Sequence, residues 1–374
     1  MKIGIITLPL HNNYGGILQA YALQKVLQTL GHNAVVIDKS RIIKLSFSYK
    51  CISYFKQTVK KLLLDKRTII RWDKKYNNER TMIGTYTSPF ILKYIKRTVA
   101  NHNYSNITSN EFDAFVVGSD QVCRPKYFGQ DIISCAYLSF AKDWNVKRIS
   151  YAASFGTEDW EYTEEQTALC KELIQQFDAI SVRESSAVKL CKEHLGADAL
   201  HVLDPTMLLN VSDYVKLFTD AKTPESPGNL MCYILDETEE KQKVIVSVEQ
   251  ALNITAFSVN SKYEDPNAPL EERIQPPVET WLRGFYDADF VVTDSFHACV
   301  FSILFEKPFI VYGNKDRGMA RFHSLLSIFG LENRLITNSE ETQKVIAEPI
   351  DWNAVNVKKK EWKEKSINFL KNSL

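Results

Sequence analysis

The segment at residues 289–313, DFVVTDSFHACVFSILFEKPFIVYG, limits the possible folds of this chain more than any other. Two β-branched and aromatic runs within it, Phe290–Thr293 and Phe309–Tyr312, predict buried strands, and the apolar stretch between them at 298–305 has the length of a short helix. A helix that connects two strands in this way makes them parallel strands of one sheet. The residues at 294–297, Asp-Ser-Phe-His, stand at the start of this helix, where α/β proteins bind their ligands.

Strands alternate with helices in the same way over most of the chain. A strand at 3–8, a helix at 14–31 and a strand at 34–38 predict an opening βαβ unit. Further strand-like runs, with apolar-periodic helices between several of them, occur at residues 113–120, 148–156, 178–186, 199–205, 230–237 and 254–260. This alternation predicts mostly parallel sheets with helices on both faces, arranged as two doubly wound, Rossmann-like α/β domains with a cleft between them.

The chain is long enough for two domains, because 374 residues exceed what one hydrophobic core normally serves. A polar, turn-rich segment at 220–229 precedes the second series of strands. We predict an N-terminal α/β domain at 1–205, a C-terminal α/β domain at 206–345 and a basic helix at 346–374 that packs back on the N-terminal domain.

The composition argues against several classes of protein. A net charge of +1 speaks against a global role in binding nucleic acid or a membrane, and 45% hydrophobic with 24% charged residues is ordinary for a globular protein. The seven cysteines are scattered without a C-x-x-C pair, which favours reduced thiols and no zinc site. The first apolar run is too short for a signal peptide, and no run reaches the ~18 apolar residues of a membrane span. We expect a cytoplasmic protein without a bound metal.

The charge is concentrated in one predicted insertion at 41–100. Fifteen Lys and Arg residues stand there against three acidic ones, a net charge of +12, so the rest of the chain carries −11. Aromatic residues are interleaved with these cations. One interpretation is a solvated helical insertion, and another is a surface that meets anionic lipid headgroups or a diphosphate, at the inner face of the plasma membrane. Nucleic acid is disfavoured, because no recognition motif accompanies the charge.

Polar side chains follow several predicted strands at the point where each strand ends. Because the carboxyl ends of parallel strands meet at one edge of a sheet, we expect these side chains to lie close together. The candidates are Asn12, Asn13, Tyr14, Gly15, Gly16, Gly118, Ser119, Asp120, Gln121, Ser154, Phe155, Gly156, Arg183, Glu184, Asp294, Ser295, His297, Lys315, Arg317 and Arg321.

Each candidate on the N-terminal side also has a purely structural interpretation. Gly15 and Gly16 can form a tight turn or let a ligand approach the backbone, and their spacing is not that of a dinucleotide site. Asp120 can cap the following helix. Arg183 stands where a helix starts, which opposes the helix dipole unless it pairs with a ligand anion or with a carboxylate such as Glu184.

The C-terminal candidates point to an anion. An imidazolium at a helix N-terminus is unfavourable, so His297 is either a core histidine or needs a bound anion to stay charged. Arg317 and Arg321 lie four residues apart, and they form a solvated face or hold a carboxylate or phosphate. Together the strand-end residues describe a site for a small, doubly anionic ligand.

Motifs at these positions resemble the polysaccharide pyruvyl transferase family. The fragments NNYGGILQAYALQ, FVVGSDQV, SYAASFG, ISVRESS, VLDPTMLL and TDSFHACVFSILFEKPFIV carry the resemblance, and only the basic insertion lies outside it. The resemblance implies a GT-B-like fold, with the acceptor on the N-terminal side and the donor on the C-terminal side. It also implies phosphoenolpyruvate as a co-substrate, no cofactor, and a cyclic pyruvate ketal on a saccharide as product.

By the same resemblance, Arg183 and His297 match the family's donor-binding arginine and histidine. Many members have an arginine where this chain has Ser295, so Arg317 and Arg321 are our candidates for the missing donor contact. Many members also have glycine where this chain has Ala298, so the pose of the donor is left open.

The expected roles follow from the chemistry of ketal formation. We assign His297, Arg183 and Asp120 as catalytic and Arg183, Ser295, His297, Arg317 and Arg321 as donor-binding. Acceptor-binding residues are Asn12, Asn13, Tyr14, Gly15, Gly16 and Gln121. The expected acceptor is a saccharide linked to undecaprenyl diphosphate, as a precursor of a bacterial capsule or other surface polysaccharide.

Two other functions remain open. A GT-B glycosyltransferase that uses a nucleotide sugar needs a carboxylate to hold the ribose, and the sequence has no clear motif of that kind. Loss of the cationic and histidine positions would favour a non-catalytic module that binds a sugar or an anion. These positions are present here apart from Ser295.

Overall fold

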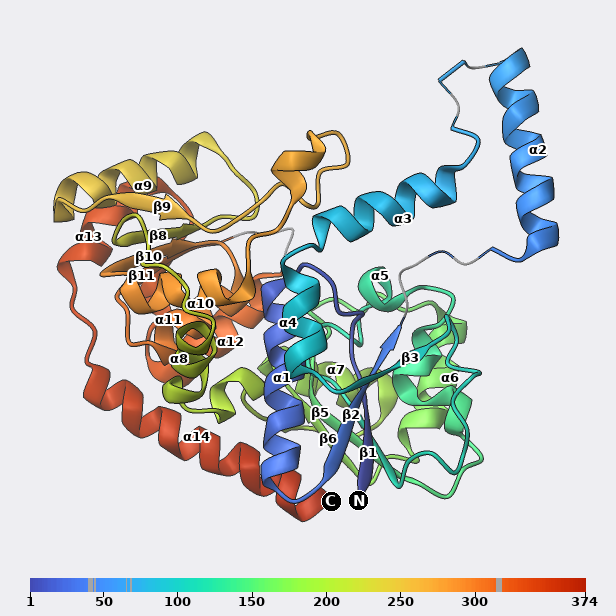
Figure 1. Cartoon of the computed structure of the whole chain (residues 1–374). Helices are drawn as coiled ribbons and strands as arrows, with labels where there is room; N and C mark the ends of the chain where they lie inside the picture. Colours follow the sequence, from blue (N-terminus) through green and yellow to red (C-terminus); the bar gives the residue numbers. More distant parts are fainter. Residues whose placement is uncertain (40–42, 44, 65, 68, 314–317) are drawn as a thin grey trace.

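The computed structural model describes residues 1–39, 43, 45–64, 66–67, 69–313 and 318–374. It contains two sheets whose paired strands are all parallel, with helices on both faces (Figure 1). The prediction of two doubly wound α/β units is confirmed. The first sheet has the order β3-β2-β1-β4-β5-β6-β7 and consists of β1 (Lys2–Ile6), β2 (Asn33–Lys39), β3 (Arg97–Ala100), β4 (Ala114–Val117), β5 (Lys147–Ala153), β6 (Ala179–Val182) and β7 (Leu200–His201).

The second sheet lies entirely beyond residue 229. It has the order β12-β11-β10-β8-β9 and consists of β8 (Leu230–Tyr233), β9 (Ala256–Ser258), β10 (Phe290–Thr293), β11 (Phe309–Tyr312) and β12 (Leu335–Ile336). The larger helices that accompany it are α8 (Val211–Asp220), α9 (Glu239–Leu252), α10 (Val278–Asp287), α11 (Phe296–Leu304), α12 (Met319–Phe329) and α13 (Thr342–Ala347). We call the parts built on the first and second sheets the N-terminal and C-terminal halves.

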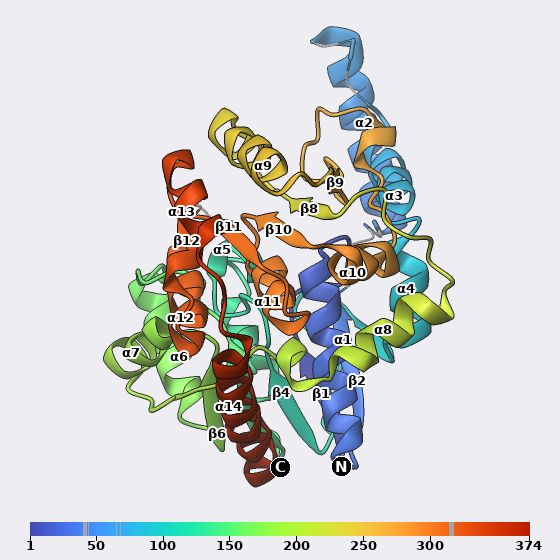
Figure 2. The same cartoon turned by 90° about the vertical axis from the view of Figure 1, so that its left-hand side faces the viewer.

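Helix α1 (Tyr14–Thr29) runs between the two halves (Figures 1 and 2). It begins where the side chain of Asn13 accepts a hydrogen bond from Gly16 N at 2.9 Å, and it ends before Gly31, whose φ of +88° favours glycine. Most of its residues are buried, and they belong to one hydrophobic cluster that also includes residues of β10 and α11. The core is therefore continuous across both halves.

The basic segment at 41–100 is only partly an insertion, which corrects the predicted boundaries. Helices α2 (Phe47–Leu63) and α3 (Trp72–Ile83) stand away from the body, but α4 (Thr87–Tyr94) buries Phe90 and Ile91 in the core and β3 pairs with β2. The strand was not recognised because its four residues, RTVA, follow a cluster of cations and carry little apolar periodicity.

Helix α14 (Trp352–Ser373) leaves the C-terminal half and lies along the N-terminal half (Figure 2). Its Ser366 hydroxyl accepts a hydrogen bond from Leu203 N at 3.0 Å, and the ring of Phe369 lies 6.2 Å from that of Tyr151. The described residues include no helix that is long and apolar enough to cross a membrane. The helices not named so far are α5 (Pro125–Phe128), α6 (Glu164–Ile174) and α7 (Ser185–Leu190).

Candidate active site

A pocket lies where the carboxyl ends of strands from the two sheets face each other. The N-terminal half contributes residues that follow β1 and β4, and the C-terminal half contributes residues from α10, from α12 and from the segments after β8, β9 and β10. The described lining residues are Asn13, Gly15, Asp120, Gln121, Tyr127, Tyr233, Leu235, Tyr263, Glu264, Trp281, Asp294, Ser295, Phe296, His297 and Arg321. Seven of the twelve residues to which we assigned a role are among them, so most of the expected convergence takes place.

His297 and Gly15 bring the first turns of α11 and α1 into contact. A Cβ atom added to Gly15 would lie 2.0 Å from His297 Nδ1 and 2.2 Å from its Cγ, which is closer than atoms can pack. Glycine is therefore required at position 15 because it leaves room for the imidazole. This reason differs from the two that the sequence suggested, a tight turn and the approach of a ligand. A Cβ on Gly16 would meet Asp120 Oδ2 at 3.5 Å, an ordinary contact.

Arg183 lies behind the pocket in a buried network of carboxylates. Its Nη1 donates to Asp204 Oδ2 at 2.7 Å, and its Nη2 lies 3.5 Å from Asp120 Oδ1. Burial lowers the pKa of this guanidinium, but the two carboxylates outweigh burial and raise it above its ordinary value. Arg183 is not among the described residues that line the pocket. The geometry suits a residue that positions others better than one that grips a ligand directly.

Asp204 joins this network to the histidine. Its Oδ2 lies 3.6 Å from His297 Nε2, and its Oδ1 accepts hydrogen bonds from Thr206 N and Oγ1 at 3.0 and 2.7 Å. Although burial opposes ionisation, the neighbouring His297 and Arg183 hold the pKa of this carboxyl far below its ordinary value. The carboxylate therefore stays charged and holds the guanidinium by a hydrogen bond, whereas the imidazole lies beside it within ion-pair distance but beyond hydrogen-bond distance.

We expect Asp204→Asn to lower the free energy of unfolding at pH 7 by about 3–5 kcal/mol, because the buried Arg183 loses its anion. The folded pKa of Asp204 lies below the ~3.9 of an unfolded aspartate, so its contribution is complete above about pH 5 and falls as the pH drops further. Urea unfolding at pH 7 and pH 3 measures the difference between the wild type and the variant, which should shrink by about 1 kcal/mol at the lower pH.

The half-exposed Asp213, which pairs with Lys25 at 2.8 Å, provides a matched control. Asp213→Asn should cost less than about 1 kcal/mol at pH 7. A loss for Asp204→Asn that is as small as that of the control, or that does not shrink at pH 3, would contradict the assignment.

Arg321 is the described cation that faces the pocket. It comes from α12, and its guanidinium carbon lies 5.3 Å from the centroid of the Phe296 ring, which Arg183 also contacts at 4.6 Å. Burial and the nearby positive charge of Arg183 lower the pKa of Arg321 to about 10. Two cations on one buried aromatic ring repel each other, so a bound anion would be favoured here. Arg317 lies outside the described residues.

Ser295 and Asp294 have separate roles at the start of α11. Ser295 is the N-cap residue and lines the pocket. Asp294 pairs with the buried Lys241 at 2.7 Å and accepts hydrogen bonds from Leu235 N and Asp236 N at 2.7 and 3.1 Å. Asp294 thus fastens the end of β10 to the segment after β8, which holds the C-terminal wall of the pocket in place.

Three predicted acceptor residues, Asn12, Tyr14 and Gly16, are not among the described residues that line the pocket, and the side chains of the first two lie in the core. The hydroxyl of Tyr14 donates to Pro276 O at 2.8 Å, and its ring stacks on Trp281 at 5.3 Å. Asn12 is fully buried, and its Oδ1 accepts a hydrogen bond from Thr87 Oγ1 at 2.9 Å. Tyr14 thereby connects α1 to the segment before α10 in the C-terminal half. Asn12 connects the segment before α1 to α4.

Glu184 is not the partner of Arg183, which was one interpretation of the sequence. Its Oε1 accepts hydrogen bonds from Ser154 Oγ and from the backbone of Phe155 and Gly156 at 2.7–3.0 Å. A Cβ on Gly318 would lie 1.9 Å from Gly156 O, so this loop touches the start of α12. Glu184 therefore stabilises the loop at 154–156, which contacts the start of α12, the helix that carries Arg321.

A larger cavity of about 620 Å³ adjoins the pocket and shares Leu235, Tyr263 and Glu264 with it. It lies beyond the ends of β8 and β9 and is rich in acceptors of hydrogen bonds. Its described lining consists of Ile234, Leu235, Asp236, Glu237, Ser258, Asn260, Ser261, Lys262, Tyr263, Glu264, Asp265 and Glu272. Carboxylates, amides and hydroxyls of this kind suit a ligand with many hydroxyl groups.

Sequence reasoning missed Asp204, Phe296 and Tyr127. Asp204 follows a predicted strand, as the other candidates do, so the same signal could have found it. Phe296 stands next to the predicted His297, but nothing in the sequence indicated that its ring would lie beside two guanidinium groups. No group of three or more His, Cys, Asp and Glu side chains able to hold a metal occurs among the described residues.

Solved structures with the same architecture are known. UDP-GlcNAc 2-epimerase from Methanocaldococcus jannaschii is similar over 99% of this chain and 99% of its own, with 12% sequence identity and a TM-score of 0.50. UDP-GlcNAc 2-epimerase from Neisseria meningitidis bound to UDP-GlcNAc is similar over 98% of this chain and 94% of its own, with 11% identity and a TM-score of 0.48. At such identity the likeness concerns the fold alone, and the GT-B-like architecture is confirmed.

No curated protein sequence matches the chain. The profile of the polysaccharide pyruvyl transferase family, in contrast, matches residues 13–316. This span begins at the N-cap residue of α1 and includes Asp120, Arg183, Asp204 and His297. The chain therefore belongs to the polysaccharide pyruvyl transferase family.

Proposed function

We propose that this chain transfers the enolpyruvyl group of phosphoenolpyruvate to two hydroxyls of a saccharide, which yields a cyclic pyruvate ketal and phosphate. The observation that carries the proposal is a pocket with a buried arginine and a histidine, Arg321 and His297, in a member of this family. A doubly anionic donor would relieve the repulsion between Arg321 and Arg183, and it would place its anionic groups beside the imidazole.

The reaction requires two additions to C2 of the donor. A proton is added to C3, C2 gains oxocarbenium character, and the first sugar hydroxyl adds to C2 and loses its proton. The C2–O bond to phosphate then breaks, and the second hydroxyl adds and closes the ring with loss of its proton. One hydroxyl proton replaces the one given to C3 and the other leaves with phosphate, so no external acid or oxidant is consumed.

The described residues can be assigned to these steps. His297, which lies beside Asp204, supplies the proton to C3 or stabilises the departing phosphate. Arg321 binds the anionic groups of the donor, and Arg183 positions Asp204 and Asp120. Asp120 lines the pocket, and we assign it as the carboxylate that accepts the hydroxyl protons.

We place the saccharide in the larger cavity, with its reacting hydroxyls directed at the pocket through the shared wall of Tyr263 and Glu264. Asn13 and Gln121 face the opposite side of the pocket and would orient the reacting sugar unit. A saccharide linked to a lipid diphosphate is the proposed acceptor, and the proposed place of reaction is the inner face of the plasma membrane.

Incubation of the full chain with phosphoenolpyruvate and a panel of lipid-linked sugars tests the proposal. We expect a pyruvate ketal by mass, with one phosphate released for each ketal. His297→Ala should lower turnover by ~10²-fold or more, because the acid is lost. His323→Ala, an exposed histidine on α12, should have no effect.

Two results would contradict the proposal. Phosphoenolpyruvate should raise the melting temperature of the chain, and the absence of any shift at saturating concentrations would speak against donor binding. Release of a nucleoside diphosphate from a nucleotide sugar, without consumption of phosphoenolpyruvate, would identify a glycosyltransferase.

A further inference from the structure

Helix α2 projects from the body on an arm whose second helix is α3. Figures 1 and 2 both show α2 at the end of the molecule opposite to the two termini. None of the residues of α2 is buried. A 17-residue helix gains its stability mostly from packing an apolar face, so one without buried residues calls for an explanation.

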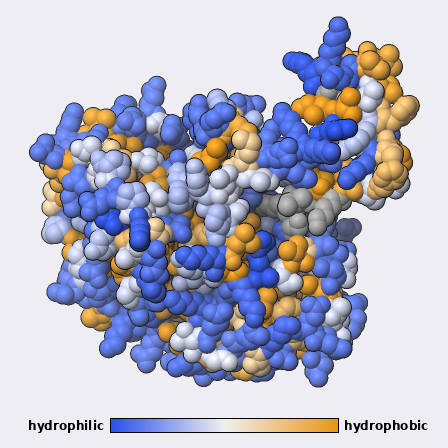
Figure 3. Space-filling view, in the orientation of Figure 1, coloured by the Kyte–Doolittle hydropathy of each residue, from blue (hydrophilic) through white to orange (hydrophobic). Residues whose placement is uncertain are grey.

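The apolar residues of α2 form one stripe that faces solvent. Phe47, Cys51, Phe55, Val59 and Leu62 follow one another at intervals of three or four residues, so they lie on one side of the helix. Phe47 is 84% exposed, Phe55 71% and Leu62 77%. Ile52, Leu63 and Leu64 extend the exposed apolar surface. In Figure 3 this surface is the orange and tan area at the edge of the arm.

The polar side of α2, in contrast, faces the protein. Tyr54 donates its hydroxyl proton to Asp73 Oδ1 at 2.8 Å, and Trp72 Nε1 donates to Ser53 Oγ at 3.2 Å. These contacts hold α2 against the start of α3 and fix which side of α2 faces α3. The usual orientation of an amphipathic helix is thereby reversed, and the apolar stripe points away from the body.

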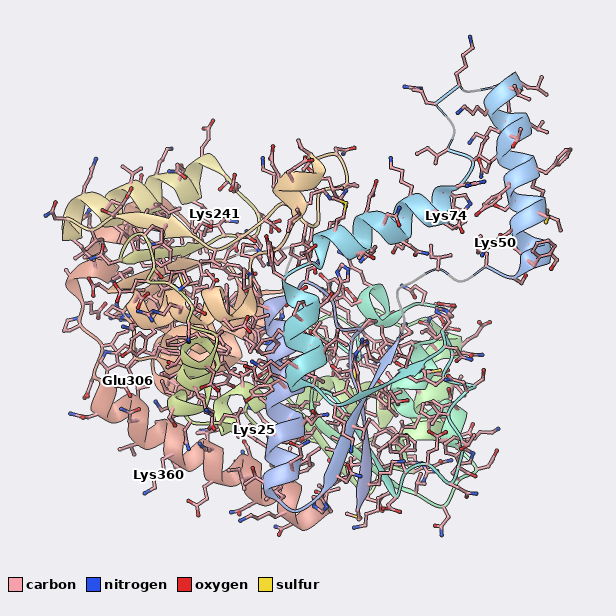
Figure 4. All side chains as sticks on the ribbon, viewed as in Figure 1. Lys25, Lys50, Lys74, Lys241, Glu306 and Lys360 are labelled. Atoms are coloured by element: carbon pink, nitrogen blue, oxygen red, sulfur yellow. The ribbon has the colours of Figure 1, made fainter. Side chains whose placement is uncertain are left out.

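The charge of α2 selects one class of partner. Four lysines accompany the stripe and the helix has no acidic residue, so a second copy of α2 would be repelled. Figure 4 shows Lys50 of α2 and Lys74 of α3 on the arm. Phenylalanine and leucine on one face with lysine on the other is the pattern of helices that lie in the interface of an anionic membrane. The lysines of α2 are Lys50, Lys56, Lys60 and Lys61.

We propose that α2 is an interfacial helix that docks the chain on anionic lipid, with the stripe from Phe47 to Leu62 in the headgroup–acyl boundary and the lysines on the headgroups. Docking itself does not depend on the proposed function. Only its purpose, delivery of a lipid-linked acceptor, rests on that function.

The base of the arm lies at the rim of the pocket. Gln275 N donates to Ile83 O at 3.1 Å, and Arg273 Nη1 lies 3.8 Å from Glu79 Oε2, so α3 contacts the segment that follows the pocket residues Tyr263 and Glu264. A bilayer held by α2 would therefore lie at the end of the molecule at which the pocket lies. This arrangement shortens the path of a lipid-linked saccharide to the site.

Co-sedimentation of the full chain with vesicles tests the docking. We expect binding to vesicles that contain phosphatidylglycerol, weaker binding to phosphatidylcholine alone, and a loss of binding at high salt. Lys56→Gln/Lys60→Gln/Lys61→Gln should weaken partitioning by ~10²-fold. Phe47→Ser/Phe55→Ser/Leu62→Ser should weaken it by ~10-fold or more.

Helix α14 offers a matched control, because it is also basic but packs its apolar residues on the body. It lies far from α2, as the position of Lys360 in Figure 4 shows. Val357→Ser/Lys358→Gln/Lys360→Gln removes an exposed apolar side chain and two charges there, and it should leave binding unchanged. The α2 variants should keep full activity toward a soluble acceptor, which separates a failure of docking from a failure of the proposed function.

Cys51 provides a direct readout, because it lies in the stripe and is exposed while the other six cysteines are buried. An environment-sensitive fluorophore on its thiol should shift to shorter wavelength with anionic vesicles and become protected from an aqueous quencher. No shift and no sedimentation at low salt would overturn the proposal. A concentration-dependent dimer that the serine variant abolishes, without vesicle binding, would assign the stripe to a protein partner and equally overturn it.

Discussion

Gly15→Ala is expected to lower transferase turnover by ~10²-fold or more while the chain stays folded. The added methyl group would lie 2.0 Å from His297 Nδ1, so the imidazole must leave its position beside Asp204. A displacement of about 1 Å at a reacting group is enough for a loss of this size. Alanine itself is favoured over glycine in a helix, so the first turn of α1 should not be weakened.

Gly16→Ala is the control, since it makes the same chemical change one residue along the same helix. Its methyl group would meet Asp120 Oδ2 at 3.5 Å, an ordinary contact, so turnover should change by less than about threefold. Phosphate release from phosphoenolpyruvate and the melting temperature are measured for both variants. Equal activities of Gly15→Ala and Gly16→Ala would mean that the position of the imidazole does not limit the reaction.

The periodicity of the sequence was sufficient to predict the fold and the edge at which the site lies. Runs such as Phe290–Thr293 and Phe309–Tyr312 are long and apolar, so their type and order are unambiguous. The polar residues after such strands then had to converge, as Asp120, Ser295 and His297 do. Strand β3 was missed because a short edge strand needs few apolar residues and is defined by its partner β2.

The roles of individual site residues depended on packing that the sequence does not encode locally. Arg183 could have paired with its neighbour Glu184, but the fold brings it to Asp204, twenty-one residues away, and turns Glu184 to the loop at 154–156. Tyr14 stands next to Asn13, yet the ~100° rotation between successive helical residues points it into the core. The amphipathic pattern of α2 likewise indicates a helix without revealing which side is packed.

Replacement of each arginine beside Phe296 by methionine should have a different main effect, on donor binding for Arg321 and on the stability of the fold for Arg183. Arg321→Met removes a buried cation that Arg183 repels and that faces the pocket, so donor binding should be lost and turnover should fall by ~10²-fold or more. Arg183→Met leaves Asp204 without its main cation, so the free energy of unfolding should fall by about 3–5 kcal/mol. Thermal melting with and without phosphoenolpyruvate measures both effects.

Arg321→Met should therefore melt closer to the wild type than Arg183→Met does and lose the shift caused by phosphoenolpyruvate. The double variant Arg183→Met/Asp204→Leu should regain part of the stability lost in Arg183→Met, because the unpaired buried charge is removed while the donors of Thr206 lose their acceptor. It should not regain activity, since His297 then lacks the carboxylate that orients it. If phosphoenolpyruvate still stabilises Arg321→Met as it does the wild type, Arg321 does not bind the donor. If the double variant is fully active, the Asp204 carboxylate has no part in positioning the histidine.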